Sequence, residues 1–286
     1  MDTGETPAGL AHEYLVDGVP VPVWLDNASE ACFGEDLVLS TPETDATASQ
    51  PWYPEGFTVV DLFSPDSFAE LRAAMEATLR GVMLQIGIDT RGFTLERYHR
   101  FVDDAQHYQI VGRTRDLFQR DVALDVAAMH ARLGAVFGRP LTDMAPAAMG
   151  GQLHIILRVN RPGSTDFNPV HKDIYEPVDN LGLVPPLINF WVPIAGVGPD
   201  SALPIAPGSH RLNERTILRT RAGSRVEGRA YRVNSIPEWD GSRSLERVRV
   251  RGGQVLIFSP HLIHGLAVNR TPDTTRVALE FRLMPA

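Results

Sequence analysis

The segment "NPVHKDIYEP" (Asn168–Pro177) places two potential metal ligands, His171 and Asp173, two residues apart in a stretch rich in turn-forming residues. An imidazole and a carboxylate can share one metal ion. In a chain with nine histidines, however, a single His-x-Asp pair is weak support for a metal site. A third ligand, a further functional group and a scaffold that unites them must come from other parts of the chain.

The downstream run "GGQVLIFSPHLIHGLAVNR" contains two further histidines, His261 and His264. In an extended segment these side chains would point to opposite faces, so at most one of them is expected to join the site. Two histidines and one carboxylate leave adjacent positions on an iron ion open, which is how non-haem Fe(II) oxygenases admit a cosubstrate and dioxygen. We favour His264 as the third ligand because of the residues that follow it.

Arg276 begins a strand-like run after His264, and the turn-forming residues "NRTPD" lie between them. Such a turn would bring Arg276 back beside His264, where its guanidinium could hold a carboxylate through two parallel hydrogen bonds. Arg270 and Arg282 are competing candidates for this task. Alternation along a strand places Arg276 and Arg282 on the same face.

The elements that must position these residues change in character near residue 150. After it, short β-branched and aromatic runs alternate with Gly, Pro and Asn turns, and about eight such strands predict a sandwich or barrel. Before it, the runs "SPDSFAELRAAMEATLRGVMLQIG" and "RDLFQRDVALDVAAMHARLGAVFGRPL" predict helices. The segment "EYLVDGVPVPVWLDN" predicts an early hairpin around Asp17 and Gly18.

We therefore expect an α+β, mainly β chain that forms one domain over residues 1–286. Residues 1–150 would supply a helical support and lid region, and residues 151–286 the β core with the metal site. The polar stretch "STPETDATASQPWYPEG" is expected to be loop or lid material.

The composition narrows the class of protein. A formal net charge of -8 argues against a nucleic-acid partner. The single cysteine, Cys32, excludes an internal disulfide or a Cys-rich metal site and is typical of a reducing cytoplasm. The N-terminus lacks secretory-signal features, and the most apolar stretch is broken by prolines and too short to span a bilayer. We expect a cytoplasmic monomer or homodimer that acts on a small molecule, with no membrane partner.

Between about Leu153 and Leu283 the segments "HKD", "LPIAPGSHR" and "HGLAVNRTPDTTR" carry four motifs in order: His-x-Asp, Pro-Gly-Ser-His, His-Gly and Arg. On this basis the chain resembles the phytanoyl-CoA dioxygenase family of Fe(II)- and 2-oxoglutarate-dependent oxygenases. The resemblance implies a double-stranded β-helix, which is a cupin-like jelly roll, with flanking N-terminal helices. It also implies Fe(II), 2-oxoglutarate and O2 as cofactor and cosubstrates.

By the same resemblance, His171, Asp173 and His264 are the iron ligands, and Arg276 binds the distal carboxylate of 2-oxoglutarate. Related iron halogenases replace the carboxylate ligand with a small residue, which opens a position for chloride. Asp173 therefore favours oxygenation over halogenation. The "PGSHR" segment is interpreted as structural, because Pro-Gly makes a tight turn there.

Other contacts to the cosubstrate are less defined. Trp191 matches an aromatic residue that the family often places beside 2-oxoglutarate, although plain core packing would also explain it. Asn189 shares the face of Trp191 by strand alternation. Members often carry Ser or Thr two residues after the distal histidine, where this chain has Leu266. Thr271, Asn189 or Gln152 could supply the missing contact.

Substrate contacts are expected from the N-terminal half and from the loop after the metal motif, because such rims vary with function. The candidates, each with an alternative role in packing or at the surface, are Tyr98, His99, Arg100, His107, Tyr108, Tyr175 and Glu176. Their mix of polar, charged and aromatic groups indicates a polar, sugar-like substrate. The Arg- and Ala-rich composition is typical of an enzyme of specialised-metabolite biosynthesis, such as that of a sugar-containing antibiotic. The expected reaction is hydroxylation, oxidative cyclisation or desaturation at an unactivated C–H bond. The alternatives are a non-catalytic jelly-roll binding module or pseudoenzyme, and a cupin-like hydrolase or isomerase.

Overall fold

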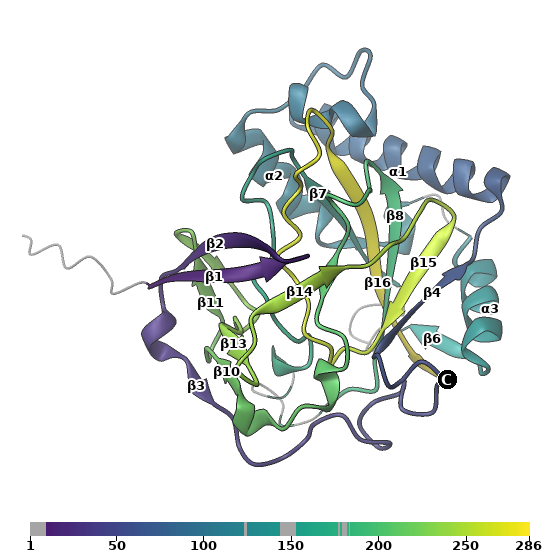
Figure 1. Cartoon of the computed structure of the whole chain (residues 1–286). Helices are drawn as coiled ribbons and strands as arrows, with labels where there is room; N and C mark the ends of the chain where they lie inside the picture. Colours follow the sequence, from purple (N-terminus) through teal and green to yellow (C-terminus); the bar gives the residue numbers. More distant parts are fainter. Residues whose placement is uncertain (1–9, 123–124, 144–152, 177, 179–181, 183) are drawn as a thin grey trace, which may run out of the picture.

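The computed structural model describes residues 10–122, 125–143, 153–176, 178, 182 and 184–286. Its largest sheet has seven strands in the order β4-β15-β8-β16-β7-β5, with β6 paired to β16, and every pairing is antiparallel (Figure 1). The strands are β4 (Phe57–Asp61), β5 (Leu117–Phe118), β6 (Leu141–Asp143), β7 (His154–Asn160), β8 (Ile188–Ala195), β15 (Gln254–Phe258) and β16 (Arg276–Pro285).

Two smaller sheets form the opposite β layer. The six-stranded sheet has the order β12-β11-β2-β1-β14-β9, and the three-stranded sheet has the order β13-β10-β3. Their strands are β1 (Leu10–Val16), β2 (Val19–Leu25), β3 (Cys32–Phe33), β9 (Pro204–Ile205), β10 (Ile217–Arg219), β11 (Ser224–Val226), β12 (Arg229–Tyr231), β13 (Glu238–Trp239) and β14 (Ser244–Arg247). The predicted hairpin is confirmed as β1–β2, because Asp17 and Gly18 turn with φ values of 54° and 75°.

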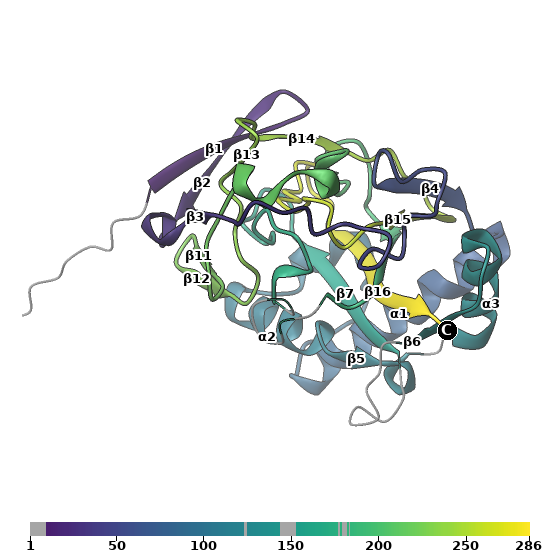
Figure 2. The same ribbon diagram turned by 90° about the horizontal axis from the view of Figure 1, so that it is seen from below.

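Three α-helices, α1 (Pro65–Gln85), α2 (Asp104–Thr114) and α3 (Val126–Phe137), lie outside the seven-stranded sheet (Figure 2). As predicted, α1 begins at Ser64, whose hydroxyl accepts a hydrogen bond from the amide of Ser67. As predicted too, α3 ends at Gly138, which has a left-handed conformation. The short 3-10 helices are Ala28–Glu30, Leu95–Arg100, Gln119–Asp121, Ser209–Arg211 and Glu214–Thr216.

The helices differ from the prediction between residues 103 and 125. Helix α2 was not predicted, although Asp103 and Gln106 form a capping box at its start. The second predicted helix begins too early, since its first residues form β5 and a 3-10 turn. Residues 1–150 are also more than a helical support, because β1, β2 and β4 belong to the β layers.

Strand alternation gives the seven-stranded sheet two different faces. One face of β7, β8 and β16 packs against the helices through buried apolar side chains: Ile155, Leu157, Val159, Ile188, Phe190, Val192, Leu279, Phe281 and Leu283. The intervening positions carry polar side chains that line a cavity between the β layers: His154, Arg158, Asn160, Asn189, Arg276, Glu280 and Arg282. The mainly β, jelly-roll architecture expected from the sequence is confirmed, and none of the described helices is long and apolar enough to cross a membrane.

Replacement of Leu79 by alanine tests the packing of α1 on the sheet. Leu79 is fully buried in the core, whereas Leu84 of the same helix is 56% exposed. We expect Leu79→Ala to lower the free energy of unfolding by about 2–5 kcal/mol because it leaves a cavity. Leu84→Ala should change it by no more than about 0.5 kcal/mol. Urea unfolding measures both values, and equal effects would show that α1 does not anchor the core.

Candidate metal centre

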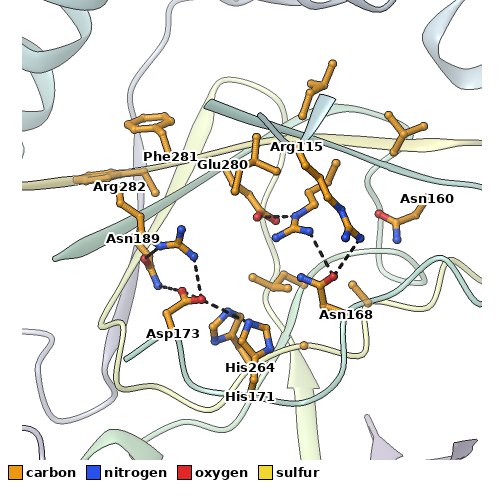
Figure 3. A pocket seen from close by; sticks show the side chains of 18 of the residues that line it. Arg115, Asn160, Asn168, His171, Asp173, Asn189, His264, Glu280, Phe281 and Arg282 are labelled. Atoms are coloured by element: carbon orange, nitrogen blue, oxygen red, sulfur yellow. Dashed lines mark hydrogen bonds and ion pairs between the residues drawn. The ribbon is translucent and has the colours of Figure 1, made fainter. Parts of the chain in front are cut away.

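His171, Asp173 and His264 meet at the end of the jelly roll cavity. One potential ligand atom from each residue lies within 4.8 Å of the other two. His171 Nε2 is 3.4 Å from Asp173 Oδ1, and His264 Nε2 is 3.7 Å from Asp173 Oδ2 (Figure 3). All three side chains are buried, with at most 8% of each exposed. The structure thus brings the three predicted ligands together.

The backbone itself holds the two histidines side by side. The amide of His171 donates to the carbonyl of His264 (2.9 Å), and the amide of His264 donates to the carbonyl of His171 (3.0 Å). This pairing is an isolated antiparallel bridge, and a second bridge joins His264 to Ile205 of β9. Gly265 allows it, since a Cβ atom there would lie 2.3 Å from the carbonyl oxygen of Pro169.

Both imidazoles present the same nitrogen to the centre. Nδ1 of His171 lies 2.7 Å from the carbonyl oxygen of Pro169, and Nδ1 of His264 lies 3.0 Å from that of Leu262. A carbonyl only accepts, so each Nδ1 carries the proton and each Nε2 keeps a free lone pair for a metal. Burial lowers the pKa of His264 to about 4. The imidazole of His264 is therefore neutral at neutral pH, as metal binding requires.

Asp173 is held as an ionised carboxylate. Its Oδ1 accepts a hydrogen bond from Arg282 (2.8 Å), and its Oδ2 accepts one from Asn189 Nδ2 (2.7 Å). Arg282 also donates to Asn189 Oδ1 (3.2 Å), so the three side chains form a closed network. Burial alone would raise the pKa of Asp173, but the charge of Arg282 and the polar contact with His171 hold that pKa well below its ordinary value.

A cavity of about 230 Å³ connects this cluster to Arg276 at the start of β16. Only 2% of Arg276 is exposed, its guanidinium lies 5.2 Å from the ring of Trp191, and its NH1 makes one long hydrogen bond to Ala267 (3.5 Å). Its Nε has no hydrogen-bond partner among the described residues. Burial lowers the pKa of Arg276 to about 10, so it stays charged at neutral pH. A buried cation with free donors is suited to an anionic ligand.

The structure distinguishes Arg276 from Arg270 and Arg282, the two other candidates for binding a carboxylate. Arg282 lies on the same face as Arg276, as alternation predicted, and both line the cavity. The guanidinium of Arg282, however, is engaged by Asp173. Arg270 does not line the cavity and donates to the carbonyl of Pro20. Arg276 is thus the candidate of the three with free donors in the cavity.

His261 is excluded from the metal cluster. Residues 260–262 form a turn rather than a continuation of β15, so His261 and His264 do not lie in one strand. The ring of His261 is fully buried, with Nε2 3.3 Å from the carbonyl oxygen of Thr44. Nearby, Asp45 accepts a hydrogen bond from Ser259 (2.6 Å) and fixes the start of this turn.

The residues expected to contact 2-oxoglutarate in place of the missing Ser or Thr lie in different parts of the structure. Leu266 packs into an apolar cluster behind the site. Thr271 is not among the residues that line the cavity, whereas Asn189 lines it but is bonded to Asp173. Gln152 lies outside the described residues. Trp191 is fully buried and lies beneath Arg276 rather than in the cavity wall.

The side chains predicted to contact substrate do not line the cavity: Tyr98, His99, Arg100, His107, Tyr108, Tyr175 and Glu176. Tyr98 and His107 are buried and bonded to each other (3.1 Å), and His107 also contacts Asp166 (3.1 Å). The hydroxyl of Tyr175 donates to Glu214 (2.7 Å) inside the core. The prediction is corrected for Tyr98, His107 and Tyr175, because each satisfies a buried polar group instead.

The remaining substrate candidates lie away from the cavity. His99 and Arg100 both contact Asp273. Tyr108 donates to Asp166 across 3.4 Å and is 38% exposed. Glu176, after the metal motif, is half-buried and is likewise absent from the cavity wall. For these four residues the structure gives no support to the predicted substrate contact.

Sequence reasoning missed the polar wall that the cavity does have. Arg158 of β7 pairs with Glu280 of β16 (2.7 Å) and donates to Asn168 (3.3 Å), and Arg115 approaches the same Asn168 (3.5 Å). The pattern that could have revealed Arg158 and Glu280 is their alternation with apolar residues in two strands that were predicted. Arg115 had no such pattern, because it lies where a helix continuing to Phe137 was predicted.

Two imidazoles and one carboxylate that face a buried arginine across a jelly-roll cavity define the class of non-haem iron oxygenases. The family model of phytanoyl-CoA dioxygenase (PhyH) matches residues 53–278, which is most of the chain. The chain therefore belongs to this family of Fe(II)- and 2-oxoglutarate-dependent oxygenases. The described cluster of His171, Asp173 and His264 is consistent with its iron chemistry.

Several solved structures are similar to the chain. EvdMO1 has 17% identity over 84% of this chain and 50% of that chain, with a TM-score of 0.50. EctD from S. alaskensis, solved with 2-oxoglutarate and 5-hydroxyectoine, has 18% identity over 90% of this chain and 84% of that chain, with a TM-score of 0.48. AviO1 from Streptomyces viridochromogenes Tue57 has 16% identity over 85% of this chain and 96% of that chain, with a TM-score of 0.44. The comparison with EvdMO1 supports the fold, and a search of the curated proteins finds no match.

Replacement of Gly265 by alanine tests the backbone pairing of the two histidines. The new Cβ would collide with the carbonyl of Pro169, and the φ of +134° disfavours any side chain. We expect at least about 10-fold weaker anaerobic Fe(II) binding by calorimetry, because the ligands would move apart. Gly87→Ala is the matched control, since Gly87 also has a positive φ but open space around it. Wild-type Fe(II) affinity in Gly265→Ala would contradict the assigned role.

Proposed function

We propose that this oxygenase binds Fe(II) through His171, Asp173 and His264, binds 2-oxoglutarate through Arg276, and oxidises a C–H bond of a polar small molecule. The observation that carries the proposal is that the three candidate metal ligands and the buried guanidinium of Arg276, whose Nε has no partner among the described residues, line one cavity. A dicarboxylate can then reach the metal with one end while the arginine holds the other.

The donor set fits Fe(II). Two neutral imidazole nitrogens and one carboxylate oxygen suit a divalent transition metal and leave room for further ligands. Within the described residues no fourth His, Cys, Asp or Glu side chain joins the cluster, so the site is not closed in the manner of a structural zinc site. The unpartnered Nε of Arg276 fits a cosubstrate carboxylate, which would supply the missing acceptor.

Fe(II) with 2-oxoglutarate and O2, when bound, couples the oxidative decarboxylation of 2-oxoglutarate to the oxidation of a substrate C–H bond. The chain contributes binding, orientation and exclusion of water. Arg282 and Asn189 fix the plane of the Asp173 carboxylate and keep it ionised. Leu203 and Phe258 add apolar lining beside the cluster, which lowers the local dielectric constant and strengthens the electrostatic contacts there.

The polar wall of the cavity supports a polar substrate. Side chains of Arg115, Arg158, Asn160, Asn168 and Glu280 line it together with the metal cluster. We propose hydroxylation as the default reaction, with oxidative cyclisation or desaturation as the other outcomes. Specialised-metabolite biosynthesis, including that of sugar-containing antibiotics, is the metabolic setting that we propose for such a substrate.

The metal-to-ligand charge-transfer band of anaerobic protein with Fe(II) and 2-oxoglutarate tests the ligand set. Wild-type protein should develop the band, and His171→Ala and His264→Ala should lose it because each removes an iron ligand. His261→Ala is the control, since this buried histidine lies outside the cluster and should leave the band in place.

Each outcome of the band experiment has a definite meaning. If wild-type protein forms no band and releases no succinate when oxygen is added, the oxygenase proposal fails. A band without succinate formation in the presence of candidate substrates would instead favour a binding protein or pseudoenzyme. Retention of the band in His264→Ala, together with its loss in His261→Ala, would overturn the choice of distal ligand.

Replacement of Arg276 by glutamine tests the cosubstrate anchor. Loss of a buried charge pair between the guanidinium and a carboxylate should weaken 2-oxoglutarate binding by roughly 30-fold or more. Titration of the charge-transfer band with 2-oxoglutarate measures the affinity, and Fe(II) binding should stay near the wild-type value. Arg270→Gln is the matched control because Arg270 lies outside the cavity. Equal losses in the two variants would contradict the anchor role of Arg276.

A further inference from the structure

The described part of the cavity wall contains four arginines: Arg115, Arg158, Arg276 and Arg282. Two of them are neutralised by carboxylates of the wall. Arg158 pairs with Glu280 (2.7 Å), and Arg282 pairs with Asp173 (2.8 Å). The third, Arg276, is assigned to the cosubstrate under the proposed function. Arg115 is left, and no carboxylate of the described residues lies within ion-pair distance of it.

The one remaining acid of the wall does not serve Arg115. Asp166 is paired with Arg161 (2.8 Å) and with His107 (3.1 Å), and it also accepts a hydrogen bond from Tyr108. These partners use both carboxylate oxygens of Asp166. Asp166 therefore forms no direct ion pair with Arg115.

Arg115 lies at the C-cap of α2, where the helix meets the cavity. Arg115 is an exposed residue, and the partial burial of its side chain, together with the charge of Arg158, lowers its pKa. Its NH2 makes a single long contact, 3.5 Å, to Asn168 Oδ1 (Figure 3). Arg113 on the same helix instead donates to Gln85 away from the cavity. Arg115 is thus a cation that faces the cavity without an anion.

Asn168 adds a second donor at the same place. Its Oδ1 accepts from Arg158 (3.3 Å) and from Arg115 (3.5 Å), so both guanidinium groups converge on one oxygen. This orients the amide, and its Nδ2 donates no hydrogen bond to another described residue. The mouth of the cavity therefore offers an unpaired guanidinium and an unused amide N–H, both of which are donors. Only an acceptor, and best an anionic one, satisfies both groups.

The net charge of the site with Fe(II) and 2-oxoglutarate bound also favours an anionic ligand. Fe(II) and the two carboxylates of 2-oxoglutarate cancel, and the pairs of Arg158 and Arg282 with their carboxylates cancel as well. Arg276 then remains as excess positive charge inside the cavity, and Arg115 remains as positive charge at its exposed mouth. An anion on the substrate would reduce this excess, whereas a neutral substrate would leave it.

We propose that the substrate carries an oxyanion, either a carboxylate or a phosphate, which Arg115 and the amide of Asn168 bind at the mouth of the cavity. This inference rests on the proposed function, because it assigns Arg276 to 2-oxoglutarate. It narrows the substrate class from a polar molecule to an anionic one. It also orients that molecule, with its anionic end against α2 and the rest directed toward the metal cluster.

A calorimetric titration with simple probes tests the subsite. Anaerobic protein saturated with Fe(II) and 2-oxoglutarate is titrated with benzoate, with the neutral analogue benzamide, and with phenyl phosphate. Wild-type protein should bind one of the oxyanions at least about 10-fold more tightly than benzamide. Arg115→Gln should reduce that preference to within about 2-fold. Arg113→Gln, the matched control on α2, should keep it.

The same titrations separate the two levels of the proposal. Preference for benzoate identifies a carboxylate, and preference for phenyl phosphate identifies a phosphate. The charge-transfer band is recorded throughout, and its absence from wild-type protein would defeat the proposed function and the inference with it. A normal band without any preference for an oxyanion would overturn the subsite alone. Weaker 2-oxoglutarate binding in Arg115→Gln would also overturn it, because Arg115 would then hold the cosubstrate.

Discussion

The site depends on one short piece of backbone pairing. His171 and His264 lie far apart in the sequence, yet each donates its amide proton to the carbonyl of the other. Hydrogen bonds of this kind require the two backbone segments to approach closely. Gly265 permits this approach, because a Cβ atom there would collide with the carbonyl oxygen of Pro169. Carbonyls of the same two loops hold the ring nitrogens that do not face the centre. One local constraint therefore sets the distance, orientation and tautomer of both imidazoles before any metal arrives.

Most charged side chains of the cavity lie on strands whose successive residues alternate between an apolar face and a polar face. The face of β7 and β16 that meets the helices is apolar, and the other face carries buried arginines. Such cations are costly without partners, so Arg158 and Arg282 are paired with carboxylates. Arg276 is as deeply buried but has no carboxylate partner among the described residues, and this difference indicates where an anionic ligand binds. The same sheet thus stabilises the fold with one face and selects ligands with the other.

The sequence predicted the features that depend on repeating patterns or on neighbouring residues. It failed for the features that depend on tertiary packing. Period-two runs predicted β7 and β16, and the capping residue Ser64 predicted the start of α1. The ligand triad followed from residue types and motif order. The predicted substrate contacts had no such basis, because whether a Tyr or His faces a cavity depends on its tertiary neighbours. Tyr98 and His107, for example, bond to each other inside the core.

The two histidines of "HLIH" show how close the alternatives were in sequence. A turn at residues 260–262, and not strand alternation, separates them. Asp45 from the N-terminal half accepts from Ser259 (2.6 Å) at the start of this turn and from Ser40 (2.7 Å). Its charge also acts on His261, which stays buried behind the site. The stretch that was expected to be loop or lid material therefore anchors the segment that carries the distal ligand, which makes His261 part of the scaffold and leaves His264 to the metal.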